Sequence, residues 1–186
     1  MRVAVLALQG AFMEHEQMLW KIGTDTVELR KKEDLDRPFH ALILPGGEST
    51  VQGKLLRELG MFDGLQERIR EGLPVLATCA GLILLAEEIS NDKNVYFGTL
   101  PVTVKRNAYG RQLSSFHTEE MFEGLGIQPM EFIRAPYIEH AGKDVEILSG
   151  SGDRITAVRY KNQLAMSFHP ELCENTDIHE AFIKNI

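Results

Sequence analysis

The chain has 186 residues, 44% apolar and 25% charged, a composition typical of one soluble globular domain with a sizeable core. Its net charge is −7, and its longest basic run is Arg30-Lys31-Lys32, so a nucleic-acid backbone is not the expected ligand. The longest uncharged apolar stretch, Leu73 to Ala86, is shorter than the about 18 residues typical of a membrane span, so no membrane partner is expected.

The N-terminal apolar run and the cysteines indicate the compartment. Val3 to Leu8 is too short for the apolar core of a signal peptide, which needs about 7–15 residues. The two cysteines, Cys79 and Cys173, cannot build a disulfide framework. We therefore expect a cytoplasmic protein with free thiols.

Short apolar segments alternate with amphipathic segments in the first half of the chain. The expected strands are residues 3–8, 26–29, 41–44 and 74–78, and the expected helical segments are 12–22 and 51–70. The pattern Ser49-Thr50-Val51-Gln52 resembles a capping box and predicts that a helix begins at Ser49. This βαβ rhythm predicts an α/β fold, in which helices flank both faces of a mainly parallel or mixed central sheet.

The second half has shorter, β-like segments. The expected strands are residues 102–105, 112–116, 132–134, 145–148, 155–159 and 164–168, with turn signals at 107–110, 150–153 and 161–162. The last two strands are expected to form a hairpin, and residues 177–184 a closing helix. No repeat or linker interrupts the chain, so residues 1–186 are expected to form one domain with additional antiparallel strands in its C-terminal half.

Cys79 lies in Ala77-Thr78-Cys79-Ala80-Gly81, between an apolar run and a helix-forming segment. A lone cysteine is often only a small core residue. Here, however, the order strand, sharp turn, helix is typical of an elbow that exposes a nucleophile and directs the next backbone N–H, that of Ala80, toward an oxyanion. The pattern favours acyl transfer through a thioester at Cys79.

The segment Phe168-His169-Pro170-Glu171 supplies a candidate base and carboxylate. Because proline disfavours a helix interior, we expect an extended chain in which His169 and Glu171 point to the same side, so that Glu171 orients the imidazole. Cys79, His169 and Glu171 would then form a triad. The alternation of His169, Glu171 and Cys173 also permits a metal site, but the paired ligand spacing typical of zinc is absent, and Cys173 is more simply a bystander thiol.

Three loops are expected to meet at the carboxyl edge of the sheet, where ligands bind in such folds: Gln9-Gly10, Pro45-Gly46-Gly47 and Cys79. Gly46-Gly47 can direct backbone N–H groups at an anion, as one half of an oxyanion hole. Arg106, Arg111 and Arg134 are either solvated charges or binders of a substrate carboxylate, and their spacing does not decide between these readings.

These motifs together resemble class I, triad-type glutamine amidotransferases and, more narrowly, the glutaminase subunits of pyridoxal 5′-phosphate synthase. The resemblance extends over nearly the whole chain and is carried by Leu8-Gln9-Gly10, Gly46-Gly47-Glu48-Ser49-Thr50, Thr78-Cys79-Ala80-Gly81-Leu82, Arg106-Asn107-Ala108-Tyr109-Gly110-Arg111-Gln112, Ile133-Arg134-Ala135-Pro136 and Phe168-His169-Pro170-Glu171-Leu172. Ala77, Val51 and His117 depart from the commonest pattern of this family, and none of them belongs to the triad.

The resemblance implies a flavodoxin-like three-layer fold and hydrolysis of L-glutamine to L-glutamate and ammonia, with no cofactor and no metal. By similarity, the oxyanion hole is formed by the backbone of Gly47 and Ala80, and glutamine is bound by Gly47, Glu48, Ser49, Arg106, Ile133 and Arg134. The implied partner is the synthase subunit, joined in a hetero-oligomer that receives the ammonia for vitamin B6 biosynthesis.

Two other functions remain open from the residues alone. One is a stand-alone cysteine hydrolase of the same fold that cleaves γ-glutamyl substrates. The other is a non-catalytic interaction protein with a vestigial pocket. Turnover of γ-glutamyl peptides without a partner would favour the first, and failure of a glutamine-analogue electrophile to label Cys79 would favour the second.

Overall fold

The computed structural model describes residues 1–107, 115–151 and 154–186. Within these residues, ten strands form one sheet in the order β2-β1-β3-β4-β12-β11-β9-β6-β5, with β10 paired to β11. These strands are β1 (Arg2–Leu6), β2 (Asp25–Leu29), β3 (Ala41–Leu44), β4 (Val75–Thr78), β5 (Ala86–Ile89), β6 (Leu100–Lys105), β9 (Tyr137–Ala141), β10 (Glu146–Ser151), β11 (Arg154–Tyr160) and β12 (Gln163–Met166). A separate antiparallel pair consists of β7 (Ser115–Phe122) and β8 (Gly126–Ile133).

The sheet is parallel in one half and mixed in the other. Neighbouring strands along β2, β1, β3, β4 and β12 are parallel, in the spatial order of a flavodoxin-like fold. Beyond β12, the pairs β12–β11, β11–β9 and β9–β6 are antiparallel. The predicted α/β fold with antiparallel strands in the C-terminal half is therefore confirmed.

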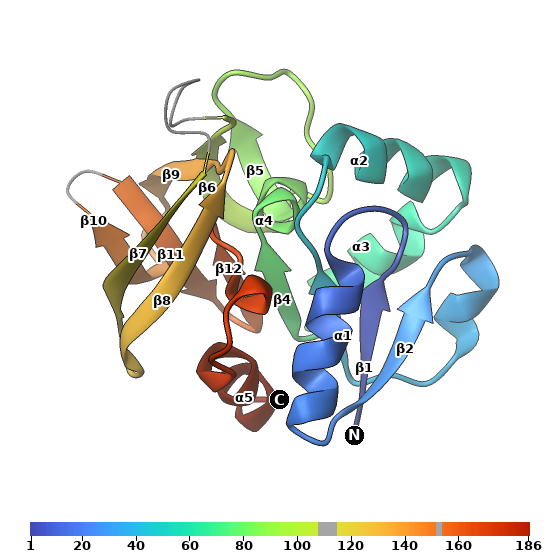
Figure 1. Cartoon of the computed structure of the whole chain (residues 1–186). Coiled ribbons are helices and arrows are strands. Elements are labelled where there is room, and N and C mark those ends of the chain that lie inside the picture. Colours follow the sequence, from blue (N-terminus) through green and yellow to red (C-terminus); the bar gives the residue numbers. More distant parts are fainter. Residues whose placement is uncertain (108–114, 152–153) are drawn as a thin grey trace.

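Helices cover both faces of this sheet (Figure 1). One face packs against α1 (Phe12–Lys21), α5 (Asp177–Lys184) and the β7–β8 pair. The other face packs against α2 (Ser49–Glu58), α3 (Phe62–Arg70) and α4 (Ala80–Leu85). Two short 3₁₀ helices, η1 (Lys32–Asp36) and η2 (Pro170–Leu172), complete the helical elements of the described residues.

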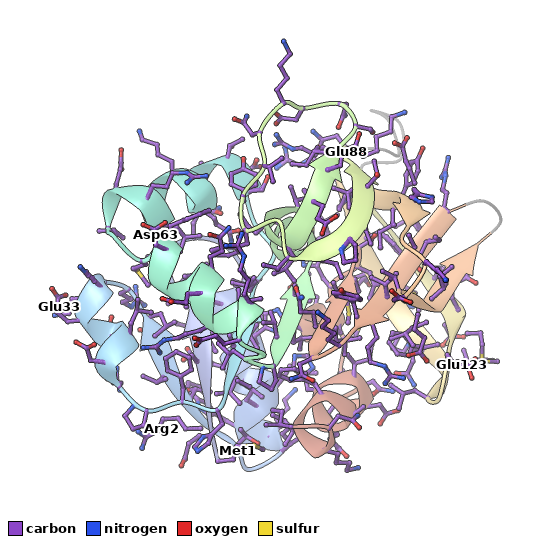
Figure 2. All side chains as sticks on the ribbon, turned by 180° about the vertical axis from the view of Figure 1, so that it is seen from behind. Met1, Arg2, Glu33, Asp63, Glu88 and Glu123 are labelled. Atoms are coloured by element: carbon purple, nitrogen blue, oxygen red, sulfur yellow. The ribbon has the colours of Figure 1, made fainter. Side chains whose placement is uncertain are left out.

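The strand alternation divides the core into two apolar layers. In β1, Val3 and Val5 belong to the layer beneath α1 and α5, whereas Ala4 and Leu6 belong to the layer beneath α2 and α3. All four side chains are fully buried, as expected for a central strand covered on both faces. Figure 2 shows side chains filling the space between sheet and helices, with the charged Glu33 and Glu123 at the periphery.

The segment predicted over residues 51–70 is helical, but it forms two helices, α2 and α3. The chain turns after α2 at Gly60, whose φ of 66° lies in the left-handed region that ends helices. The predicted start of a helix at Ser49 is confirmed, but the predicted capping box is wrong. The N-cap of α2 is Glu48, and the Gln52 amide donates to Gln9 O at 2.9 Å and Pro45 O at 3.2 Å instead of reaching back along its own helix.

In the second half, the predicted hairpin is confirmed, because β11 and β12 pair from Tyr160 opposite Gln163. The closing helix is found at its predicted bounds, as α5. The sequence analysis missed β9 and most of the β7–β8 pair, and the part of the strand expected over 112–116 that precedes Ser115 lies outside the described residues. None of the helices in the described residues is both long and apolar enough to cross a membrane.

Candidate active site

Cys79 occupies a strained turn between β4 and α4. Its φ and ψ are 47° and −98°, an uncommon conformation for a residue with a Cβ, and it is only 6% exposed. Its backbone N–H donates to Met166 O of β12 at 2.8 Å, which fixes the turn to the edge of the sheet. Such strain costs about 1–3 kcal/mol and is typical of functional sites. The structure thus places Cys79 in the elbow that the sequence predicts.

His169 and Glu171 meet as the sequence predicts, although the local structure differs. His169 Nδ1 lies 2.7 Å from Glu171 Oε1, and Glu171 is buried. The chain between them is not extended, because Pro170 opens the 3₁₀ helix η2 at its first position, where proline needs no N–H donor. The backbone N–H of His169 donates to Glu131 O of β8 at 2.8 Å, so the imidazole is anchored from two directions.

The electrostatics of the site favour a protonated imidazole. Burial lowers the pKa of His169, but hydrogen bonds with Cys79 and Glu171 outweigh it and raise this pKa to about 10. Burial likewise raises the pKa of the Glu171 carboxyl, but the neighbouring His15 and His169 hold it below its usual range. The two shifts agree: the Glu171 carboxylate faces the His169 imidazolium, which shares the cavity wall with Cys79.

A cavity of about 380 Å³ opens at the carboxyl edge of the parallel strands. Cys79 and His169 lie in its wall, together with the loops that follow β1 and β3. These two strands flank the point where the strand order reverses, the usual ligand position in open α/β sheets. The lining residues are Gln9, Gly10, Ala11, Glu14, Gly46, Gly47, Glu48, Ser49, Cys79, Ile83, Arg106, Asn107, Ile133, Arg134, His169 and Leu172.

The glycine loop is held by close backbone contacts. Ala11 N–H donates to Gly46 O at 3.0 Å, and Glu48 N–H donates to the Gln9 side chain at 2.8 Å. A Cβ at Gly10, whose φ is 97°, would lie 1.8 Å from Gly46 O. The loop therefore requires glycine at this position so that two chain segments can touch beside Cys79.

The charged residues expected to bind substrate line the cavity but pair with one another or with neighbours. Arg134 Nη2 lies 3.0 Å from Glu48 Oε1, across the cavity wall, and both side chains remain partly exposed. Arg106 Nη1 lies 2.6 Å from Asp92 Oδ2, which orients its guanidinium. Arg111 lies outside the described residues.

The comparisons with known proteins agree with this geometry. The SNO glutamine amidotransferase family matches residues 5–186. The chain belongs to this family. A relative from Desulfitobacterium hafniense (strain DSM 10664 / DCB-2), named pyridoxal 5′-phosphate synthase subunit PdxT, is 63% identical over 186 residues, which are 100% of this chain and 94% of the relative.

Two further comparisons support the family assignment. The PdxT of Haemophilus influenzae (strain PittGG) is 52% identical, covering 98% of this chain and 97% of the relative. A solved structure of a glutamine amidotransferase has a TM-score of 0.92 and 47% identity, covering 98% of this chain and 97% of that one. The family resemblance that the sequence motifs predict is confirmed.

The cavity brings together all the substrate residues that the resemblance implied: Gly47, Glu48, Ser49, Arg106, Ile133 and Arg134. The sequence analysis placed Gln9 in a loop at the ligand edge of the sheet, but it gave no role to the Thr78 side chain or to His15 of α1. Thr78 and His15 are fully buried beside the triad. A signal for His15 existed, because it lies three residues after Phe12 and four before Leu19, on the apolar face of the helix.

Cys173 lies outside the cavity wall. Its Sγ is 3.6 Å from Pro129 O and 3.8 Å from His169 O, and burial raises the pKa of its thiol. In the described residues, no group of three His, Cys, Asp or Glu side chains is arranged to hold a metal ion. His169 and Glu171 instead form a hydrogen bond with each other.

Proposed function

We propose that this chain is the glutaminase subunit of a pyridoxal 5′-phosphate synthase, and that it hydrolyses L-glutamine to L-glutamate and ammonia. The observation that carries the proposal is the row of Cys79, His169 and Glu171, with the first two in the wall of a cavity. The family and the names of the relatives support the choice of substrate and of partner.

In the first half of the reaction, His169 already holds the proton of the Cys79 thiol as an imidazolium, and the thiolate Sγ attacks the side-chain amide carbon of glutamine. The C–S bond forms, and the amide oxygen becomes an oxyanion. Backbone N–H groups of Gly47 and Ala80 are the proposed donors to this oxygen, because Gly47 lines the same cavity as Cys79 and Ala80 directly follows it. One such donor contributes about 3–4 kcal/mol in comparable enzymes.

In the second half, the tetrahedral intermediate collapses and the C–N bond breaks. The His169 imidazolium gives its proton to the departing ammonia, leaving a γ-glutamyl thioester on Cys79. His169 then takes a proton from water, whose oxygen attacks the thioester carbon, and the C–S bond breaks to release glutamate. Glu171 keeps the imidazole in the required tautomer throughout, through its contact with Nδ1.

Glutamine binding is assigned to the charged residues of the cavity. Glu48 is suited to the α-ammonium group, and a guanidinium of Arg106 or Arg134 is suited to the α-carboxylate. Since Glu48 and Arg134 pair with each other at 3.0 Å, the arriving amino acid would exchange this ion pair for two new ones. Gly47, Ser49 and Ile133 would shape the remaining wall.

Ammonia explains the need for a partner. Near neutral pH, free ammonia is mostly protonated and is no nucleophile, so the product is useful only if it passes directly into a synthase. We therefore propose a cytoplasmic hetero-oligomer with the synthase subunit, in which this chain supplies ammonia.

The test is ammonia release from glutamine by the chain, with and without the purified synthase. We expect stimulation by the synthase, and a loss of about a thousandfold or more in Cys79→Ala, because the nucleophile is removed. Cys173→Ala is the matched control and should keep the stimulated rate. Intact stimulated release from Cys79→Ala would end the proposal.

A further inference from the structure

A row of buried polar side chains continues behind the triad, away from the cavity. His15 Nε2 of α1 lies 3.4 Å from Glu171 Oε2 and 3.1 Å from Thr78 Oγ1. On its other side, His15 Nδ1 lies 3.0 Å from His179 Nε2 of α5. Both histidines are fully buried, and neither lines the cavity. Two fully buried histidines require an explanation, because polar groups are costly to bury.

The contacts determine which nitrogens carry protons. If His15 Nε2 were unprotonated, its lone pair would face a carboxylate oxygen of Glu171 and repel it. This nitrogen therefore carries the proton. Neutral His15 must then accept at Nδ1, which makes His179 Nε2 the donor between the two rings. His179 Nδ1 is then a bare acceptor, and it is the one atom of the two rings buried without a partner.

Both imidazoles are neutral near pH 7. Burial lowers the pKa of His15 more than Glu171 raises it, and burial together with His15 lowers the pKa of His179 to about 3. The groups that act on the charge of His15 are Glu171, His169, His179 and Glu14. The contact of His15 with Glu171 is therefore an N–H dipole beside a carboxylate rather than an ion pair.

The same histidine reaches the other side of the site through Thr78. Thr78 Oγ1 accepts the backbone N–H of Gly46 at 3.0 Å and lies 3.1 Å from His15 Nε2. Thr78 directly precedes Cys79, and Gly46 directly precedes the proposed oxyanion donor Gly47. His15 thus contacts both the triad carboxylate and the residue that holds the glycine loop.

We propose that His15 is a positioning residue for the glutaminase reaction: its Nε2–H holds Glu171 Oε2 and Thr78 Oγ1, and His179 fixes the tautomer that makes this possible. Glu171 Oε2 is buried and makes no aligned hydrogen bond within the described residues, so removal of His15 takes away the ring N–H that lies 3.4 Å from this oxygen. Glu171 would then be free to turn or to take up a proton, and His169 would lose its orientation. This inference rests on the proposed function.

The test compares His15→Leu with His15→Gln in synthase-stimulated ammonia release. Leucine removes the donor, whereas glutamine restores an N–H near the position of Nε2. For His15→Leu we expect kcat to fall about 10- to 100-fold with KM changed less than about twofold, since His15 does not touch the cavity. The alkaline limb of kcat/KM should move down by about one pH unit, because a less firmly ionised Glu171 holds the His169 proton less tightly. His15→Gln should recover most of kcat.

Gln163→Leu is the matched control. It removes two buried hydrogen bonds to Thr99, at 2.9 and 3.0 Å, near the opposite end of β12. It should lower stability while kcat and the pH profile stay unchanged. An unchanged kcat and alkaline limb in His15→Leu would overturn the inference, as would a loss in His15→Leu that His15→Gln does not relieve.

A second measurement covers the case in which His15→Leu fails to fold. Imidazole ¹⁵N NMR of the wild-type chain should show His15 protonated at Nε2 and bare at Nδ1, and His179 likewise. Protonation of His15 at Nδ1 would overturn the inference. If the wild-type chain shows no synthase-stimulated release that depends on Cys79, it is the proposed function that fails. If the wild-type chain does show this release, then a His15→Leu variant with unchanged kcat and alkaline limb refutes only the positioning role of His15.

Discussion

His169 combines burial with a raised proton affinity. The ring is 6% exposed, and burial acts against its positive charge. The raised pKa of His169 therefore depends on two neighbouring residues, Cys79 and Glu171. The Glu171 carboxylate lies 2.7 Å from Nδ1. This arrangement keeps a proton on the imidazole that can later be given to departing ammonia.

We predict that NMR titration of His169 gives a midpoint near pH 10, because its pKa is raised to about 10. By linkage, a protonated His169 stabilises the folded chain fully below pH 6.5, and this contribution is lost as the pH rises through about 10. Glu171→Gln should lower the midpoint, since it removes the carboxylate. A wild-type midpoint near 6.5, or a midpoint unmoved by Glu171→Gln, would contradict the account of the triad.

The three residues of the triad were predictable from the sequence. The residues that surround and contact the triad were not. Cys79 and His169 carry local signals, which are a small-residue elbow and the segment His169-Pro170-Glu171. Arg134 and Glu48 are 86 positions apart, and nothing local indicates that they pair across the cavity. His15 was detectable only as a buried position. Its contacts with η2 and α5 come from tertiary packing.

The elbow depends on how closely α4 approaches β3. Gly81, in the first turn of α4, faces the carbonyl of Leu44, and an added Cβ would lie 2.1 Å from that oxygen. A backbone oxygen of a central strand cannot move aside without disturbing the sheet. Glycine is thus required at position 81 because there is no room for a Cβ beside Leu44 O, and not because of its backbone φ angle.

We predict that Gly81→Ala lowers the free energy of unfolding by about 1–3 kcal/mol and impairs glutamine hydrolysis, because α4 carries the N–H of Ala80 and must shift. Gly64→Ala in α3 is the matched control. Its added Cβ would meet only the flexible end of Leu35 at 3.2 Å, so helix propensity should leave stability equal or higher. Urea unfolding curves measure both. Equal losses in the two variants would show that the contact with β3 does not matter.

At the scale of elements, the segments with a strong apolar pattern were predictable, whereas the break between α2 and α3 and the position of β9 were not. Residues 41–44 and 177–184 were predicted with their observed bounds because apolar periodicity and flanking turns agree there. The segment 51–70 reads as one amphipathic pattern, but the Gly60 turn divides it. β9 pairs with β11 and β6, and these partners are distant in sequence, so no local pattern reveals it.

For the molecule as a whole, the sheet arrangement explains why distant residues meet. Parallel β1, β3, β4 and β12 all end at one edge, so the loops after them bring Gln9, Gly46, Cys79 and His169 to one cavity. The βαβ rhythm predicted this convergence. It did not predict that β8, outside the main sheet, would add Ile133 and the anchor of His169.

The most direct test of the account is trapping of the thioester. The chain, its synthase and glutamine are mixed, quenched in acid during turnover, and digested for mass spectrometry. We predict a γ-glutamyl adduct on the peptide that contains Cys79, its disappearance in Cys79→Ala, and no adduct on Cys173. An adduct on Cys173, or sustained turnover with Cys79 unmodified at every quench time, would contradict the assignment of Cys79 as the nucleophile.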